Sequence, residues 1–218
     1  MNNKISEAVV RRLPGYCRHL EQLLKEGKQQ ISSQELGEIM GVTASQIRQD
    51  INSIGGMGRQ GYGYPIQELR DYIADILDIR RKHTMVILGA GNMGRAVARS
   101  DLFAASGFKC VGIFDNSPAK IGWEIGGLTV QDEAELESFL RENPVDIAVI
   151  TLPMANAQSN AERAAAAGIR GFWNFAPVDL HLPEGCQVVN VHLSDGLDVL
   201  SYHLHKEEEE NPSQKRAD

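Results

Sequence analysis

Apolar side chains near the N-terminus recur at three- and four-residue intervals in three short segments, which predicts three amphipathic helices. The first helix is expected to open around Pro14, because proline suits a first helical turn, and to end at Gly27. The second is expected over residues 32–41, which begin with a Ser-x-x-Glu capping box, and the third over residues 43–54, capped by Thr43. A Gly-Val-Thr turn joins these two, which is typical of a helix-turn-helix.

The pattern changes after the third helix. Residues 55–64 are dense in glycine, which predicts a tight β-hairpin of the kind called a wing. Pro65 then opens another apolar-periodic segment, which closes with two arginines and a lysine at residues 80–82, as suits the end of a helix. We therefore expect a winged helix-turn-helix domain over residues 1–80.

From residue 81 onward, short apolar runs alternate with amphipathic segments, which predicts an α/β domain with a doubly wound parallel sheet over residues 81–194. The expected strands cover residues 85–88, 109–115, 145–153, 169–175 and 186–193. The expected helices cover residues 132–143, capped by Asp132, and 160–168. A last apolar-periodic segment predicts a C-terminal helix over residues 195–206, and the acidic residues 207–218 are expected to be disordered.

Composition and charge refine this picture. No apolar run approaches the roughly 18 residues that cross a bilayer, and the N-terminus lacks the apolar core of a signal peptide, so we expect a soluble cytoplasmic protein with no membrane partner. Cys17, Cys110 and Cys186 are too sparse for a disulfide framework or a zinc site. The net charge is −7, but residues 1–82 hold 12 Lys/Arg against 10 Asp/Glu, so this part can approach DNA locally.

The main chemical signal is a G-x-G-x-x-G sequence that directly follows the strand 85–88 and opens a helix. Its glycines permit a tight turn and let a pyrophosphate approach the backbone. Asp115 ends the next strand, 21 residues after Gly94, where this fingerprint places the acidic residue that binds the adenosine ribose. Its carboxylate would repel a 2′-phosphate, which favours NADH and NAD⁺ as ligands. The turn residues expected to contact the cofactor are Gly89, Ala90, Gly91, Asn92, Met93 and Gly94.

Two further turns are expected at the carboxyl ends of strands, where ligands bind in open α/β sheets. They comprise Thr151, Leu152 and Pro153, and Asn174, Phe175, Ala176 and Pro177. We expect them to contact the nicotinamide or its ribose, although both can also be turns without a ligand. A domain of this kind that has lost its ligand, or that binds coenzyme A or another nucleotide, is the alternative interpretation.

Residues suited to catalysis are few. A dehydrogenase needs an acid/base group beside the transferred hydride and a domain that holds the substrate. Among the histidines only His192, at the end of the fifth strand, is placed for such a role, and we find no metal-ligand cluster or nucleophile elbow. We therefore predict no catalytic residue and no metal. An NAD-dependent oxidoreductase and a nucleotide-gated interaction protein without DNA binding remain as alternatives.

The third helix of the first domain carries side chains that suit DNA. Its isoleucines fall on one face, and the other face presents residue types that pair with base edges and phosphates. Arg59, in the wing, is expected to reach the adjacent minor groove. A polar surface on a small helical domain is the alternative. The helix residues expected to contact DNA are Ser45, Gln46, Arg48, Gln49 and Asn52.

In order along the chain, this sequence resembles the redox-sensing transcriptional repressor Rex family over residues 8–205. The segments that carry the resemblance are RLPGYCRHLEQL, SSQELGEIMGVTASQIRQDINSIGGMGRQGYGY, ILGAGNMGRA, FDNSPAKIG, AERAAAAGIRGFWNFAPVDL and VVNVHLSDGLDVL. The resemblance implies a homodimer in which the C-terminal helix is swapped between subunits. It further implies that NADH releases the dimer from a palindromic operator, that NAD⁺ competes, and that no reaction is catalysed.

The sequence departs from the family pattern at several places. Gln49 and the Arg59-Gln60 pair replace positions that are usually basic, which should weaken phosphate contacts. Ser100-Asp101 stand where the family commonly has a tyrosine near the nicotinamide. His192 replaces an aspartate that joins a switch network with an N-terminal arginine, here Arg12. We therefore expect weaker discrimination between NADH and NAD⁺ than the family implies.

Overall fold

The computed structural model describes residues 5–56 and 63–210. The chain divides into two compact units, residues 1–81 and residues 82–218, and each is described by itself. No helix in these described ranges is long and apolar enough to cross a membrane.

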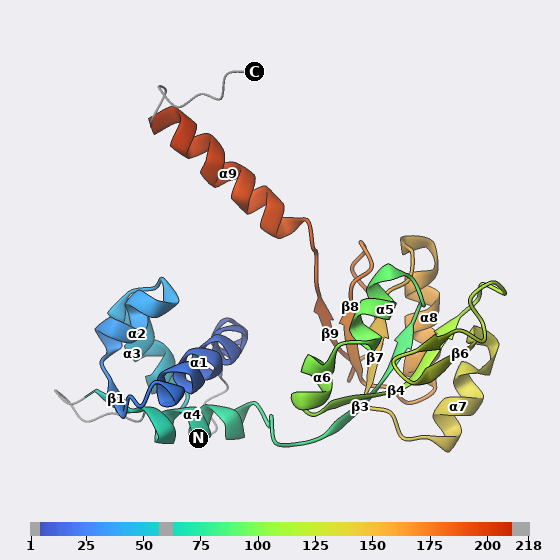
Figure 1. The fold of residues 1–218 in the computed structure, drawn as a ribbon, viewed down its shortest axis with the longest axis horizontal. Helices are drawn as coiled ribbons and strands as arrows, with labels where there is room; N and C mark the ends of the chain where they lie inside the picture. The colour runs from blue at the N-terminus through green and yellow to red at the C-terminus, as the bar shows by residue number, and fades with distance from the viewer. Residues whose placement is uncertain (1–4, 57–62, 211–218) are drawn as a thin grey trace. The chain divides into compact units, whose positions relative to one another are not determined.

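The N-terminal unit is a small helical domain with a short β-ladder (Figure 1). Its elements are α1 (Glu7–Lys25), β1 (Gln30–Ile31), α2 (Ser33–Met40), α3 (Ala44–Ser53), β2 (Tyr64–Pro65) and α4 (Ile66–Ile76). The amphipathic pattern holds, since the isoleucines of α3 and the leucines of α1 pack with Leu36 and Leu69 in one buried cluster. Strands β1 and β2 pair antiparallel, with Ile31 opposite Tyr64.

The predicted caps of the helix-turn-helix are confirmed. The Ser32 hydroxyl accepts a hydrogen bond from the Glu35 amide at 3.1 Å, and the Thr43 hydroxyl accepts one from the Gln46 amide at 3.1 Å. Gly41 ends α2 in the left-handed region with φ 67°, which an L side chain rarely adopts. The predicted wing, residues 55–64, lies mostly outside the described residues, as does Arg59.

Two predicted helix boundaries in this unit are wrong. Helix α1 begins at Glu7, not around Pro14, which lies inside it. A proline inside a helix costs about 3 kcal/mol, but the preceding turns bury Val9 and Leu13 against the same core, which offsets that cost. Helix α4 ends at Ile76, not near residue 82, because Asp78 turns the backbone into the left-handed region.

The C-terminal unit confirms the predicted doubly wound α/β fold (Figure 1). Its strands lie in the order β5-β6-β4-β3-β7-β8-β9, and all neighbours are parallel except β5 with β6. The parallel strands thus follow the 3-2-1-4-5-6 order of a dinucleotide-binding sheet. The strands are β3 (His83–Leu88), β4 (Phe108–Asp115), β5 (Glu124–Ile125), β6 (Leu128–Asp132), β7 (Ile147–Ile150), β8 (Gly171–Asn174) and β9 (Gln187–Asn190).

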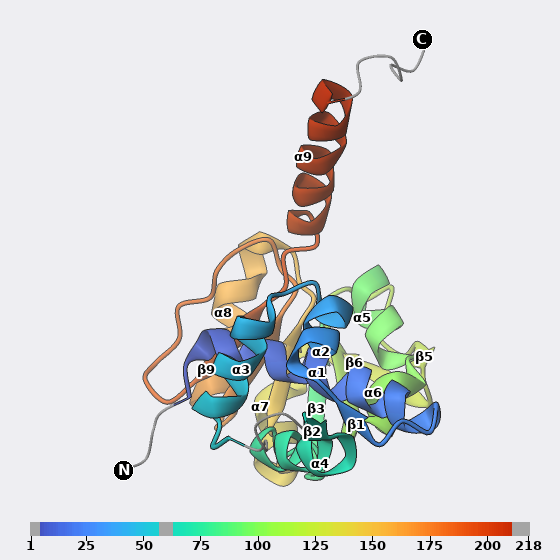
Figure 2. The ribbon, with the colours of Figure 1, turned by 90° about the vertical axis from the view of Figure 1, so that its left-hand side faces the viewer.

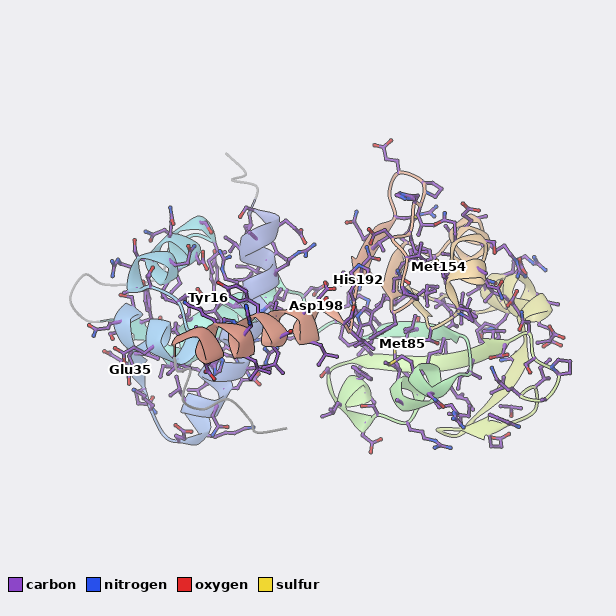
Figure 3. The ribbon with its side chains drawn as sticks, turned by 90° about the horizontal axis from the view of Figure 1, so that it is seen from above. Tyr16, Glu35, Met85, Met154, His192 and Asp198 are labelled. Atoms are coloured by element: carbon purple, nitrogen blue, oxygen red, sulfur yellow. The ribbon has the colours of Figure 1, made fainter. Side chains whose placement is uncertain are left out.

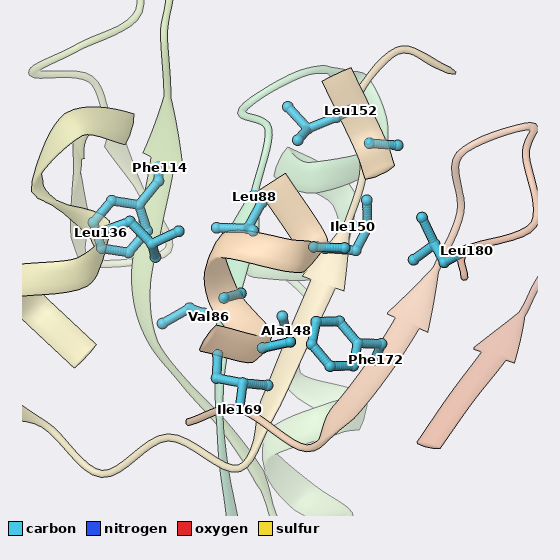
Figure 4. Close-up of a cluster of buried hydrophobic side chains, with 14 of the residues drawn as sticks. Val86, Leu88, Phe114, Leu136, Ala148, Ile150, Leu152, Ile169, Phe172 and Leu180 are labelled. Carbon is cyan, nitrogen blue, oxygen red and sulfur yellow. The ribbon is translucent and has the colours of Figure 1, made fainter. Parts of the chain in front are cut away.

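Helices cover both faces of this sheet. They are α5 (Asn92–Ala98), α6 (Asp101–Ala105), α7 (Leu136–Glu142) and α8 (Met154–Ala166), with a 3₁₀ turn at Glu133–Glu135. Val86 and Leu88 of β3 face the core beneath α7 and α8, drawn in Figure 4, whereas Met85 and Ile87 face the α5 side. This two-residue alternation explains why the central strands are apolar throughout. Helix α6 and strand β5 were not predicted, since each is very short, and at β6 the sequence showed only a short apolar run over residues 128–130.

Helix α9 (Asp195–Glu210) continues from β9, and Figure 2 shows it projecting from the sheet. The expectation that residues 207–210 are disordered is wrong, because they extend α9. Glutamate has a high helix propensity, which favours this extension. The large apolar side chains of α9 are 52–67% exposed, namely Leu197, Val199, Leu200, Tyr202 and Leu204.

Candidate functional site

The G-x-G-x-x-G sequence forms the turn between β3 and α5, as predicted. Gly89 has a φ of 107°, which an L side chain rarely adopts. A Cβ on Gly94 would lie 1.9 Å from the Gly89 carbonyl oxygen, so only glycine fits where α5 passes the turn. A Cβ on Gly91 would meet nothing within 4 Å. The turn is therefore tight on its inner side and open at Gly91, where a ligand can approach the backbone.

Asp115 is a buried carboxylate at the end of β4, and its side chain is 5% exposed. Its Oδ2 accepts hydrogen bonds from the Ala90 amide at 2.7 Å and from Lys120 Nζ at 2.9 Å. Its Oδ1 accepts one from the Ser117 amide at 2.9 Å. Burial alone raises the pKa of Asp115, but these donors outweigh burial and lower it. Asp115 thus remains charged and ties the glycine turn to the end of the neighbouring strand.

Thr151, directly after β7, supports the same turn. Its hydroxyl lies 2.8 Å from the Gly89 carbonyl oxygen and 3.1 Å from that of Leu88. A Cβ on Gly89 would lie 2.7 Å from the Thr151 carbonyl oxygen. Leu152 is buried, and Pro153 is the N-cap of α8. Thr151 therefore holds the shape of the glycine turn.

The Asn174–Pro177 turn is organised by its asparagine. The fully buried Asn174 amide donates to the Val178 carbonyl at 2.7 Å and to Asn190 Oδ1 at 2.9 Å. Its Oδ1 accepts from the Ala176 amide at 3.0 Å. Phe175 packs edge-on against Trp173, with ring centroids 4.5 Å apart. This turn, Thr151 and the glycine turn all follow carboxyl ends of parallel strands, so they share one edge of the sheet.

His192 lies in the joint between β9 and α9, as labelled in Figure 3. Its Nε2 is 3.3 Å from Asp179 Oδ1, which also accepts from Asn190 Nδ2 at 2.9 Å. Asn190 in turn contacts Asn174. A chain of side chains therefore runs from the Asn174 turn to the root of α9.

The predicted DNA-contacting residues lie on α3. Ile47 and Ile51 are buried, and Ser45, Arg48, Gln49 and Asn52 are exposed, as the helical pattern predicts. The Arg48 guanidinium donates a hydrogen bond to Ser33 Oγ at 3.0 Å. Gln46 differs from the others, because its amide donates to Asp50 Oδ1 at 2.7 Å and is thereby held against α3.

Asp50 anchors α3 to α1 and was missed by the sequence analysis. Its side chain is 2% exposed and receives two hydrogen bonds from Arg12, both 2.7 Å, and one from the Tyr16 hydroxyl at 2.9 Å. Burial raises the pKa of Asp50, but the bonds from Arg12, Gln46 and Tyr16 together lower it. Burial and the Asp50 charge raise the pKa of Tyr16. Arg12, expected in the switch network, thus has an intramolecular partner on the recognition helix.

Other chemistry is sparse in the part of the chain that the structure describes. There, no three His, Cys, Asp or Glu side chains are grouped to hold a metal ion. The three cysteines are free thiols, and burial raises the pKa of Cys110 to about 11. Such a thiol is mostly protonated near neutral pH and is a poor nucleophile.

Comparison with known proteins finds separate family models for the N-terminal unit and for the C-terminal unit. A family model described as "Putative DNA-binding protein N-terminus" matches residues 4–52, and one described as "CoA binding domain" matches residues 80–178. The chain is 48% identical over 205 residues to the redox-sensing transcriptional repressor Rex of Thermoanaerobacter pseudethanolicus, covering 94% of this chain and 92% of that protein.

Two solved structures are similar over nearly the whole chain. The repressor RSP in complex with β-NAD⁺ and operator DNA has a TM-score of 0.86 and 46% identity, covering 98% of this chain and 99% of RSP. RSP in complex with β-NADH has a TM-score of 0.87 and 44% identity, covering 97% and 99%.

Proposed function

Because this chain belongs to the Rex family of redox-sensing transcriptional repressors, we propose that it represses transcription from an operator and leaves the DNA when NADH binds. The observation that carries the proposal is the similarity to RSP, which has been solved in one complex with β-NAD⁺ and operator DNA and in another with β-NADH. The ligand acts by its different affinity for the DNA-bound and released states, so no chemical step is needed. The protein therefore acts as a sensor and not as an enzyme.

The dinucleotide binds at the carboxyl edge of the parallel sheet. The pyrophosphate approaches the open backbone at Gly91, and the adenosine ribose lies beside Asp115. The turns after β7 and β8 receive the nicotinamide half. Thr151 and Asn174 shape these turns through their own hydrogen bonds, while Phe175 and Pro177 supply contact surface.

DNA binds along the exposed face of α3. Arg48 and Asn52 are exposed on this face, with Ser45 and Gln49 beside them, and Arg48 can exchange its exposed hydrogen bond to Ser33 for one to a base edge or phosphate. Asp50 keeps this face at a fixed angle to α1. The operator is palindromic, because a two-fold symmetric dimer presents two such helices.

The dimer is built through α9. Leu197, Leu200 and Leu204 fall on one face of α9 and are exposed in the single chain, and an exposed apolar stripe of this kind marks a protein interface. We assign this stripe to a second copy of the chain. The His192–Asp179 contact at the start of α9 then connects the Asn174–Pro177 turn, through Asn190, to the dimer interface.

The test is fluorescence anisotropy on a labelled palindromic operator of the family type, at fixed salt, titrated with NADH and then with NAD⁺. We expect tight operator binding without ligand and release of the operator by NADH. We also expect NADH and NAD⁺ to differ less in their effect on operator binding than they do in a chain with aspartate at residue 192. A His192→Asp variant measures that difference directly. Operator binding that is indifferent to both dinucleotides contradicts redox sensing, and absence of operator binding contradicts the repressor function.

A further inference from the structure

We propose that the cavity between helix α6 and the amino end of β4 is a second ligand site, which takes a small neutral aromatic molecule of the phenol type. The cavity has a volume of about 150 Å³ and lies on the α5 side of the sheet. Its lining from the sheet is Met85 and residues 108–110, in the amino-terminal halves of β3 and β4. The glycine turn and Asp115 lie at the carboxyl ends of the same strands, so a ligand in this cavity does not displace the dinucleotide.

The cavity exists because α6 covers the sheet loosely. This helix has five residues, none of them buried, and its Leu102 is 76% exposed. Phe103 attaches the helix to the sheet, since its ring packs edge-on against Trp173 with ring centroids 5.2 Å apart. On the other face of the sheet, the longer helices α7 and α8 bury leucines and alanines in a continuous core. The short α6 therefore leaves space over β4 that close packing fills elsewhere.

The inner wall of the cavity is apolar. Met85 and Val97 are buried there, and Phe108, Cys110 and Leu128 pack against the same cluster. An apolar cavity of this size can hold a molecule as large as benzene. One aromatic ring therefore matches the inner wall in both size and polarity.

The rim of the cavity favours a neutral molecule with one polar group. Asp101 and Lys109 line the cavity and are exposed, so it opens to solvent on this side, and their opposite charges leave no net charge to attract an ion. Ser100 also lines the cavity, and its hydroxyl can both donate and accept a hydrogen bond. A phenol can place its hydroxyl at this rim and its ring against the inner wall.

The experiment follows phenol binding to the full chain by saturation-transfer NMR, with and without an excess of NADH. Ala104→Leu places a larger apolar side chain on the lining of the cavity. Ala105→Leu makes the same change at the next residue of α6, which does not line the cavity, and is the matched control. Thermal unfolding of each variant checks that it is folded.

Two cysteines report where the phenol binds. Cys110 lines the cavity, whereas Cys186 packs against the core on the other face of the sheet, and both are partly exposed. Alkylation at about pH 9, followed by peptide mass spectrometry, measures the reaction rate of each thiol. Bound phenol should slow the alkylation of Cys110 and leave that of Cys186 unchanged.

We expect phenol to bind with a dissociation constant of about 1 mM, as suits a ligand of one ring, and NADH to leave this constant unchanged. Ala104→Leu should weaken binding by about tenfold or more because a filled cavity excludes the ring, whereas Ala105→Leu should change it by less than about twofold. Phenol that does not bind, that is displaced by NADH, or that binds equally to both variants overturns the proposal. If Ala104→Leu does not fold, the alkylation rates decide, and a Cys110 that phenol does not protect overturns the proposal.

Discussion

Among the residues that the structure describes, each unit contains one buried aspartate with a basic partner, and the two aspartates differ in how they are enclosed. Asp50 receives its hydrogen bonds from side chains of α1 and α3, which close around it. Asp115 receives two from backbone amides and one from Lys120, whose side chain is a third exposed. Asp50 is therefore a joint between helices, and Asp115 is a ligand-site group that also supports a turn. The same residue type serves both purposes because the surroundings differ.

The largest expected effect is that of Asp50→Asn on the N-terminal unit. The amide cannot accept both bonds from the partly exposed Arg12, and the lost charge leaves the buried side of the pair incompletely bonded, so the unit should lose about 2–3 kcal/mol of unfolding free energy. Both tryptophans, Trp123 and Trp173, lie in the other unit. Urea unfolding followed by helical circular dichroism should therefore shift, while tryptophan fluorescence should not. The exposed Asp75→Asn is the control.

The second effect concerns Asp115→Asn, which should weaken NADH binding by about 10–100-fold, as expected when a charge-assisted hydrogen bond is lost. Calorimetric titration of NADH measures it, with Asp101→Asn on the exposed α6 as the matched variant. Operator binding without ligand should be unchanged. If the Asp115→Asn chain binds NADH as tightly as the unmodified chain, the Asp115 carboxylate has only a structural role, as the Asp50 carboxylate has in the other unit.

The third effect is the acid dependence of stability. Both aspartates have a lowered pKa in the folded chain, so each stabilises the fold above the unfolded pKa of about 3.9 and loses this contribution as the pH falls through the folded value. Unfolding measured by circular dichroism between pH 2 and 6 should show the difference between the unmodified chain and Asp50→Asn shrinking toward low pH. A difference that stays constant with pH would mean that the Asp50 charge is not responsible.

The smallest effect is that of the cap on the recognition helix. Thr43→Ala removes the acceptor for the Gln46 amide and should cost about 1 kcal/mol, with a modest loss of operator affinity. Thr129→Ala in the other unit removes an exposed hydroxyl and is the control. Unfolding and anisotropy on the same samples separate the two effects. Equal losses in both variants would count against a specific role for the cap.

The sequence predicted those parts of the molecule that local rules determine. Ser32 and Thr43 cap their helices, and the glycine turn between β3 and α5 needs the backbone freedom of Gly89 and the small size of Gly94. Apolar runs located the parallel strands β3, β4, β7, β8 and β9. In each case the residues that decide the structure lie within a few positions of one another.

Other features depend on distant partners and were missed for that reason. Arg12 and Asp50 are 38 residues apart, and nothing local marks either as half of a buried pair. Pro14 lies inside α1 because the turns before it are buried against the unit's core, a tertiary effect that outweighs local preference. Lys120 was close enough to find, five residues after Asp115, but only the fold of the intervening turn brings it onto the carboxylate.

The most direct measurement of the central claim is operator anisotropy of the Asp115→Asn chain during titration with NADH. We predict that this variant binds operator as tightly as the unmodified chain and stays bound at NADH concentrations that release the unmodified chain. Loss of operator binding before any NADH is added, or release at the same NADH concentration as the unmodified chain, would contradict it.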